Sequence, residues 1–231
     1  MNDGKQGYDP SPVNPLPPVV LVLSVVLFGI EAVLAGAEAG YFGGPGAVGW
    51  RLGLIEEYGF SPQIFTWMLE TGRWPLDHVM RFLTYPFLHY GFIQMIFSVV
   101  FILAMGKMVG EAMGSIAVAA IFFGSTIFGA LVYGMLPEQT TWLVGAMPGA
   151  YGLIGGFTFV LWARARLTGG NQGQAFSLIA MLMGIQLLFG LLFGGDNTWV
   201  ADLAGFIAGF VLSFVLVPGA RRALLKRLRQ E

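Results

Sequence analysis

Apolar residues gather into six long runs along the chain, and polar segments separate these runs. The runs cover residues 19–37, 90–112, 115–136, 148–167, 174–194 and 199–218. Each run is close to the ~20 residues that an α-helix needs to cross the hydrocarbon core of a bilayer. The pattern therefore predicts an all-α membrane protein with six transmembrane helices.

The connection between the first two runs, residues 38–88, is too long to be an ordinary loop. It is rich in Trp, Phe and Tyr, whose amphipathic rings are favoured at the headgroup level of a bilayer. We expect this long first loop to lie on the external side and to contain short helices at the membrane surface. Two roles are open for it, an interfacial anchor and a ledge on which a partner docks, and the two are compatible.

Lys and Arg are unevenly distributed among the polar segments. Arg164 and Arg166 follow the fourth run and five cations follow the sixth, whereas loops 137–141 and 194–198 contain none. Cytoplasmic segments carry the excess of Lys and Arg, so both termini are predicted to face the cytoplasm.

These boundaries predict three parts. Residues 1–18 form a flexible cytoplasmic N-terminal tail, residues 19–218 form the membrane domain, and residues 219–231 form a basic cytoplasmic C-terminal tail. We expect a multi-pass protein of a bacterial inner membrane.

Composition agrees with a protein embedded in the lipid bilayer. Of the 231 residues, 56% are hydrophobic and 11% are charged, against about 25% charged in soluble domains. The net charge of −1 gives no indication of a nucleic-acid partner. The chain has no Cys and two His, so we expect no disulfide, no metal site and no cofactor.

Several motifs resemble those of one family, the rhomboid intramembrane proteases. Residues 143–155, LVGAMPGAYGLIG, resemble the opening of that family's fourth helix, and residues 202–209, DLAGFIAG, resemble its sixth-helix motif. Trp50 and Arg51 resemble a pair in the family's first loop, and Glu111 stands at the acidic position of a glycine-flanked turn after the second helix. The order of these motifs implies a rhomboid-like bundle of six helices.

The resemblance also implies which positions would carry catalysis, and the two central ones differ. The position of the family's serine nucleophile holds Met147, and the position of its base histidine holds Asp202. A thioether has no proton to lose and forms no acyl-enzyme. Pro148 follows Met147 and, although well placed at a helix start, offers no backbone N–H to an oxyanion.

The groups that would stabilise the oxyanion are also altered. Residues 81–98 resemble the family's second-helix motif, in which His89 keeps the first histidine. Gln94 and Ser98 stand where the family has a second histidine and an asparagine. Met147, Asp202, Gln94 and Ser98 therefore predict a degenerate site with no peptidase activity.

Asp202 lies at the start of a membrane run, where an unpaired carboxylate is costly. Ser125, Gln186 and Tyr151 are candidate hydrogen-bond partners, and Tyr151 is the best of them because the family packs a tyrosine on its base histidine. Structural satisfaction of Asp202 and a functional polar contact both stay open. We expect Met147 and Asp202 to face each other, and the flexible Met147 to fill the former active-site cavity.

Two pairs of glycines occur at the spacing that lets helices approach closely. Gly152 and Gly156 lie on the fourth predicted helix, and Gly205 and Gly209 lie on the sixth. Small residues four apart allow close backbone contact in membranes. We expect these two helices to pack together.

The resulting functional hypothesis is a rhomboid-like pseudoprotease that binds other integral membrane proteins, or their transmembrane helices, without cleaving them. The resemblance implies that a client helix would be admitted between the second and fifth helices. One alternative is a stoichiometric accessory subunit of a larger membrane complex, and another is an active protease with unorthodox residues. A transporter is a weaker hypothesis, because no inverted pair of interrupted helices is visible.

Overall fold

The computed structural model describes residues 15–217, and nearly all of this part of the chain is helical. Six helical segments within this part of the chain overlap the six predicted apolar runs. The elements in order are α1 (Pro18–Glu38), η1 (Pro45–Gly49), α2 (Trp50–Tyr58), α3 (Pro62–Thr71), α4 (Leu76–Thr84), η2 (Tyr85–Phe87), α5 (Phe92–Met113), α6 (Ser115–Gly134), α7 (Met147–Thr168), η3 (Gln172–Phe176), α8 (Ser177–Phe193) and α9 (Trp199–Leu216). The N-terminal tail up to residue 14 and the predicted basic C-terminal tail lie outside the described residues.

Five of the described helical segments are long and apolar enough to cross a membrane: α1, α5, α6, η3 with α8, and α9. The remaining long helix, α7, has 22 residues but is not one of the five. Its glycines, together with Arg164 and Arg166, make it less apolar than the others. That α7 also crosses the membrane stays a prediction.

Glycine and proline set the boundaries of several long helices. Gly114 alone separates α5 from α6, and its φ of 89° lies in a region that side-chain-bearing residues rarely adopt. Pro18 and Pro148 stand in the first turns of α1 and α7, where a missing N–H leaves no intrahelical bond unmade. These local signals explain why the chain reverses direction where it does.

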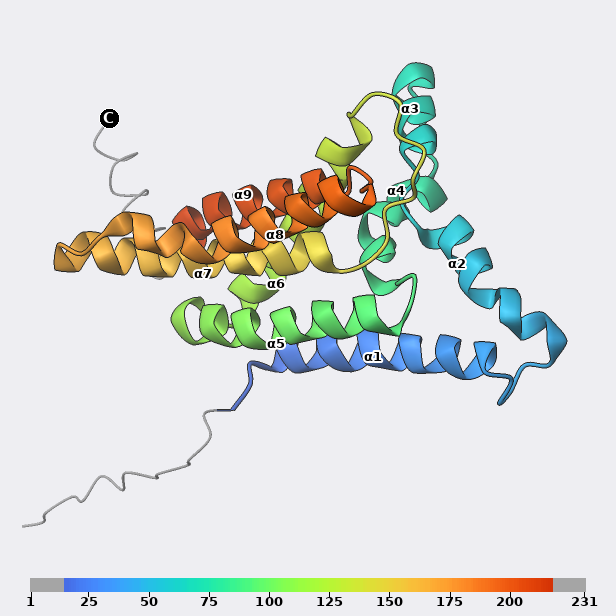
Figure 1. The fold of residues 1–231 in the computed structure, drawn as a ribbon, viewed down its shortest axis with the longest axis horizontal. Helices are drawn as coiled ribbons and strands as arrows, with labels where there is room; N and C mark the ends of the chain where they lie inside the picture. The colour runs from blue at the N-terminus through green and yellow to red at the C-terminus, as the bar shows by residue number, and fades with distance from the viewer. Residues whose placement is uncertain (1–14, 218–231) are drawn as a thin grey trace, which may run out of the picture.

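The long helices form a bundle with α7 at its centre. In Figure 1, α1 and α5 lie side by side, and α7, α8 and α9 form a second group with α6 beside them. α7 packs on α5, α6 and α9 and is buried along most of its first three turns. α8 lies at the edge of the bundle. Only 17% of the apolar segment formed by η3 and α8 is buried inside the protein, against 44% for α6.

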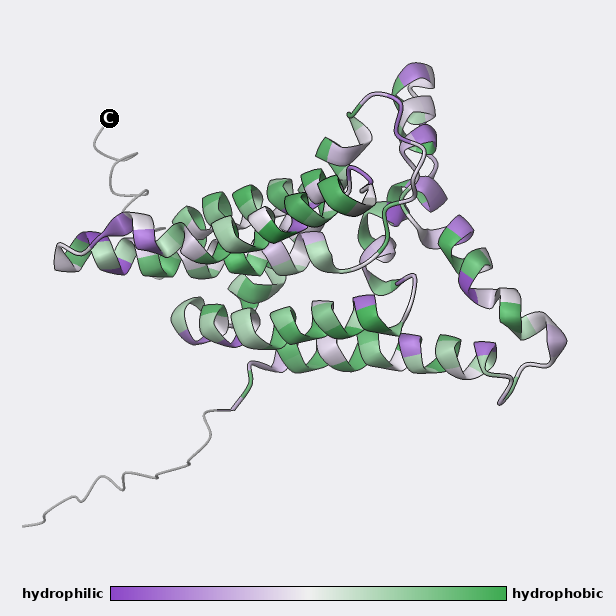
Figure 2. Ribbon diagram, viewed as in Figure 1, coloured by the Kyte–Doolittle hydropathy of each residue, from purple (hydrophilic) through white to green (hydrophobic). Residues whose placement is uncertain are grey.

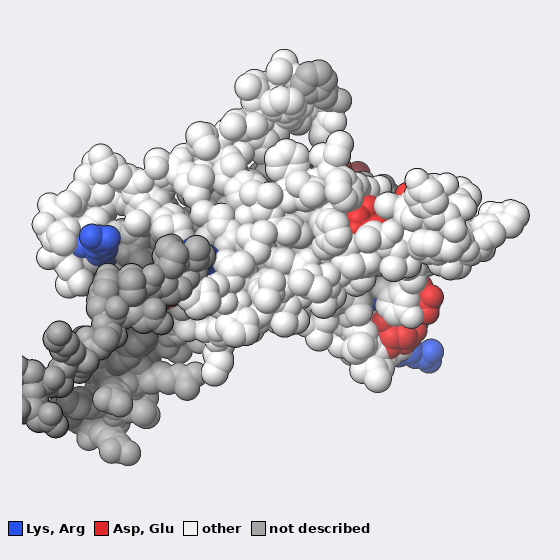
Figure 3. All heavy atoms as spheres, turned by 90° about the horizontal axis from the view of Figure 1, so that it is seen from below, with Lys and Arg blue, Asp and Glu red and all other residues white. Residues whose placement is uncertain are grey.

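The short helices α2, α3 and α4 lie at one end of the bundle, and the two ends of the described chain lie at the other (Figure 1). The long helices are mainly apolar, whereas polar residues concentrate in α2–α4 and near helix ends (Figure 2). On the face seen in Figure 3, charged side chains lie toward the two ends of the molecule. This distribution suits a protein whose middle is surrounded by hydrocarbon.

Candidate functional site

A cavity of about 200 Å³ lies where α7 and α9 begin, beside the start of α5. Met147 and Pro148 from α7, Asp202 from α9 and Gln94 from α5 all line it. The structure thus brings Met147 and Asp202 to the same cavity. It does so although 55 positions separate them, because their helices pack closely at this end.

The expectation that Met147 fills this cavity is wrong. Met147 is only partly buried and packs against the apolar cluster that contains Tyr151 and Phe206. The space that remains exceeds the ~30 Å³ share of a water molecule several-fold. Polar lining groups, including Gln94 and Asp202, make the cavity suitable for polar atoms.

Asp202 is held by α8 and only indirectly by α7. Its side chain is 5% exposed, and Gln186 Nε2 donates a hydrogen bond to Asp202 Oδ2 at 2.9 Å. The Tyr151 hydroxyl donates in turn to Gln186 Oε1 at 3.1 Å. The preference for Tyr151 as the direct partner is therefore corrected, because the Gln186 amide lies between the two groups and bonds to both. Ser125, the third candidate, has a buried hydroxyl with no hydrogen-bond partner among the described residues.

His89 and Gln94 hold the segment that leads into α7. The backbone N–H of Ala146 donates to His89 Nε2 at 3.4 Å, so this nitrogen carries no proton. Gln94 Nε2 donates to the Val144 carbonyl at 3.2 Å, and its Oε1 accepts from the Tyr90 N–H at 2.8 Å. Both side chains therefore fix backbone groups, and His89 Nε2 is an acceptor, unsuited to stabilising an oxyanion.

Ser98 does not face the cavity. It is fully buried on α5, and its hydroxyl donates to the carbonyl of Gln94 one turn earlier, at 3.1 Å. A Ser hydroxyl bonded to its own helix is a common arrangement inside apolar helices. The structure thus separates Ser98 from Met147 and Asp202.

The close contact of α7 and α9 occurs at the predicted glycines. A Cβ built on Gly205 would overlap the carbonyl oxygen of Pro148, and one on Gly209 would overlap the carbonyl oxygen of Gly152. Gly152 has no space either, because a Cβ there would overlap the Ser125 side chain. Gly156 is less crowded, with Ile121 Cδ1 3.1 Å from the Cβ position. The backbones of the two helices therefore touch, which sets the distance between Met147 and Asp202.

Arg51 is the centre of a buried ionic cluster beside the site. Its guanidinium forms a two-bond pair with Glu31 of α1, with both distances 2.9 Å, and a second pair with Glu38 at 2.6 and 3.1 Å. It also donates to the His89 carbonyl at 2.7 Å. These bonds join α1, α2 and the turn before α5, and they raise the pKa of Arg51 above its usual value.

The other motif residues lie apart from the cavity. Trp50 is exposed at the start of α2, and its ring packs over Gly43. Glu111 is in the last turn of α5, 4.0 Å from Lys107. Neither residue lines the cavity that contains Met147.

Sequence reasoning missed Glu31, Glu38 and the direct role of Gln186. A signal for Glu31 was present, since it is the only charged residue within the first apolar run up to residue 37. Ionisable residues inside membrane helices almost always pair with another group. That rule, applied to Glu31, would have pointed to a cation in the adjacent loop.

His89 makes the stability of the protein depend on pH. Burial, together with the charge of Arg51, lowers the pKa of His89 from 6.5 to about 4. The unfolded chain therefore binds a proton more readily than the folded protein between these values. The neutral, buried His89 therefore contributes about 3 kcal/mol to the free energy of unfolding above pH 6.5, and this stabilisation is lost as the pH falls toward 4. Thermal unfolding of the wild type and His89→Gln in detergent should show a larger loss for the wild type between pH 7 and pH 4.5. Equal losses would contradict this assignment.

The fold and the site define a multi-pass helical membrane protein with a polar cavity at the start of two closely packed helices. Residues 76–219, more than half of the chain, match the Rhomboid domain family. The chain therefore belongs to the rhomboid family. The match covers α4 to α9, and so includes every residue that lines the cavity.

The chain is similar to RHOMBOID-like protein 7 of Arabidopsis thaliana. The two sequences are 29% identical over 142 residues, which is 60% of this chain and 43% of the relative. The chain thus matches less than half the length of that protein.

Proposed function

We propose that this rhomboid-family protein is a pseudoprotease, which binds other membrane proteins or their transmembrane helices without cleaving them. The observation that carries the proposal is Met147, which lines the same cavity as Asp202. The motif resemblance assigns the position of the family's serine to Met147. A thioether sulfur cannot act as the nucleophile of acyl transfer. Without that nucleophile, the scaffold keeps a surface for membrane segments and loses the reaction.

The other groups at the cavity support the same proposal. None of the described residues that line it is Ser or His. Thr198, the lining residue with an aliphatic hydroxyl, donates that hydroxyl to the exposed carboxylate of Asp196 in the same loop. Acyl transfer needs a nucleophile, a base and oxyanion donors in one arrangement, and the described groups are instead bonded to one another and to the backbone.

The proposal includes an orientation of the protein in the membrane. We place α7 as a sixth span, both termini in the cytoplasm and the cavity in the external half of the membrane. The arginines that follow the fourth and sixth runs support this orientation.

Binding and cleavage measured on one preparation test the proposal. A fluorophosphonate probe should not label the purified wild-type protein, and a fluorescent transmembrane substrate should bind to it and stay intact. Met147→Ser should behave like the wild type in both assays, because Asp202 is a poor base for a serine proton and Pro148 offers no N–H. An active rhomboid protease serves as the positive control. Specific labelling of the wild type that heat denaturation abolishes would overturn the proposal.

A further inference from the structure

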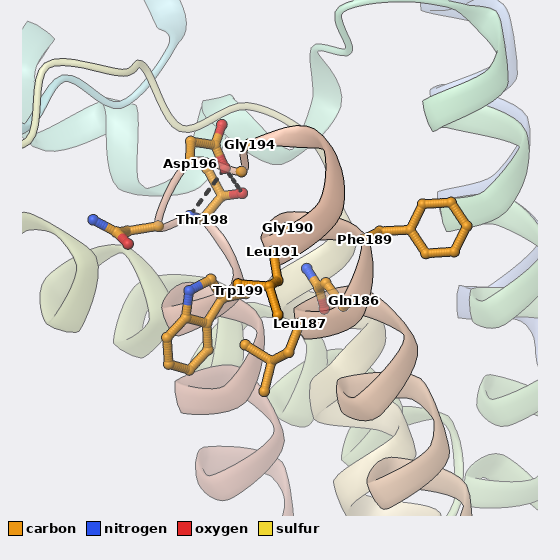
Figure 4. A pocket seen from close by; sticks show the side chains of 11 residues that line it. Gln186, Leu187, Phe189, Gly190, Leu191, Gly194, Asp196, Thr198 and Trp199 are labelled. Carbon is orange, nitrogen blue, oxygen red and sulfur yellow. Dashed lines mark hydrogen bonds between the residues drawn. The ribbon is translucent and has the colours of Figure 1, made fainter.

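The Asp202 cavity adjoins a larger hollow between the end of α8 and the start of α9. That hollow measures about 780 Å³, and Gln186, Asp196 and Thr198 line both spaces. Figure 4 shows Gln186 and side chains near the end of α8 beside Trp199 of α9, with Asp196 and Thr198 in the connecting loop. The shared lining residues place the hollow directly beside the Asp202 cavity, and we call the two spaces together the α8–α9 hollow.

The charged groups of the α8–α9 hollow are acidic. Asp196 and Asp202 line it, and none of its described lining residues is Lys, Arg or His. Asp202 is 5% exposed and accepts from Gln186 at Oδ2, whereas no hydrogen bond from the described residues reaches Oδ1. Inside a membrane a nearby cation stabilises such a carboxylate, because a buried charge without a partner is costly.

The hollow also has an apolar part. Leu187 and Leu191 of α8 and Trp199 of α9 line it, and Leu191 is 84% exposed. α8 packs on α9 through few residues, so the described part of the chain leaves this flank open. An apolar surface with one buried carboxylate at its end fits an apolar helix that carries one basic residue.

We infer that the α8–α9 hollow receives a Lys or Arg side chain from the transmembrane helix of a client, with Asp202 as the pairing carboxylate. The inference rests on the proposed function, because it requires that client helices bind, and it adds the chemistry by which they are chosen. It also places access between α8 and α9, and not between α5 and α8. Leu187, Leu191 and Trp199 then contact the apolar part of the client helix.

A pair of designed peptides tests the choice of client. Each is a Leu/Ala transmembrane helix, with either Lys or Leu at one position in its external third. Dissociation constants for the full-length protein in phosphatidylcholine vesicles are measured by energy transfer. The Lys peptide should bind at least about tenfold more tightly, as one ion pair in a low-dielectric site allows. Asp202→Asn should abolish this preference, and Asp77→Asn, an exposed carboxylate on α4, should leave it unchanged.

The outcomes separate the two proposals. Equal binding of the two peptides by the wild type overturns the charge-pairing inference and leaves client binding intact. If neither peptide binds, both the charge-pairing inference and the proposed client binding are overturned. If Asp202→Asn fails to fold, a third peptide with Glu at the same position decides the matter, since it should bind to the wild type more weakly than the Leu peptide.

Cross-linking tests the route of access. The chain contains no Cys, so single introduced cysteines report one position each. Leu191→Cys, in the hollow, should form a disulfide with a cysteine beside the Lys of the peptide. Ile93→Cys is the control, since Ile93 is 73% exposed in the first turn of α5, one residue before Gln94, which lines the Asp202 cavity. Preferential cross-linking at residue 93 would contradict access between α8 and α9.

Discussion

Arg51→Ala is expected to destabilise the protein by about 3–5 kcal/mol, the usual effect of removing one partner from a buried ion pair. The substitution leaves Glu31, which is 1% exposed, without the guanidinium that bonds both of its oxygens. It also removes the donor to the His89 carbonyl and so loosens the turn that precedes α5. Unfolding of the purified protein in mixed micelles, followed by circular dichroism, measures the change in free energy.

Two variants show whether stranded charge is the cause. Arg73→Ala removes an exposed arginine between α3 and α4 and should change the stability by less than about 0.5 kcal/mol. The double variant Arg51→Met with Glu31→Leu should be less destabilised than Arg51→Ala, because it removes the carboxylate that Arg51→Ala leaves buried without a partner. An Arg51→Ala protein as stable as Arg73→Ala would contradict the role of the cluster.

Gly209→Ala is expected to cost about 3 kcal/mol, at the upper end of the range for overpacking. The added methyl group would overlap the Gly152 carbonyl oxygen, and it would lie 2.6 Å from the Gly152 carbonyl carbon. Backbone atoms cannot turn aside as a flexible side chain does, so α7 and α9 must separate. The same unfolding measurement reports the cost, and a loss of binding to the Lys peptide would report the displacement of Asp202.

Gly29→Ala is the matched control for this variant. Gly29 is exposed on α1, and a Cβ there would meet nothing within 4 Å. Because Ala is favoured over Gly in a helix interior by about 1 kcal/mol, Gly29→Ala should be neutral or stabilising. Equal effects of the two substitutions would show that α7 and α9 do not depend on the Gly209 contact.

The chain's apolar runs were sufficient to locate its long helices. The first run, residues 19–37, became α1 with one residue added at each end, and the third and fourth became α6 and α7. This succeeds because helix length and apolar composition are local properties, tied directly to bilayer thickness. α7 shows the limit of the method, since the glycines that suit it to close packing also lower its hydropathy.

The site was only partly predictable. The motif resemblance led to Met147 and Asp202, and these residues line one cavity. The same reasoning preferred Tyr151 over Gln186 as the partner of Asp202 and expected the cavity to be filled. Both errors concern where a side chain points, which depends on neighbours from other helices and not on spacing along one helix.

The sequence by itself determined that this chain is helical and membrane-embedded, because apolar composition and run length need no three-dimensional information. It also led to the hypothesis that Met147 replaces the family's serine. Only the tertiary structure decided that Arg51 bonds Glu31 and the His89 carbonyl, which lie 20 and 38 residues away. It likewise decided that Gln186 of α8 bonds Asp202 of α9. Such pairs form when helix packing brings distant groups into an apolar interior, where each buried polar group must find a partner.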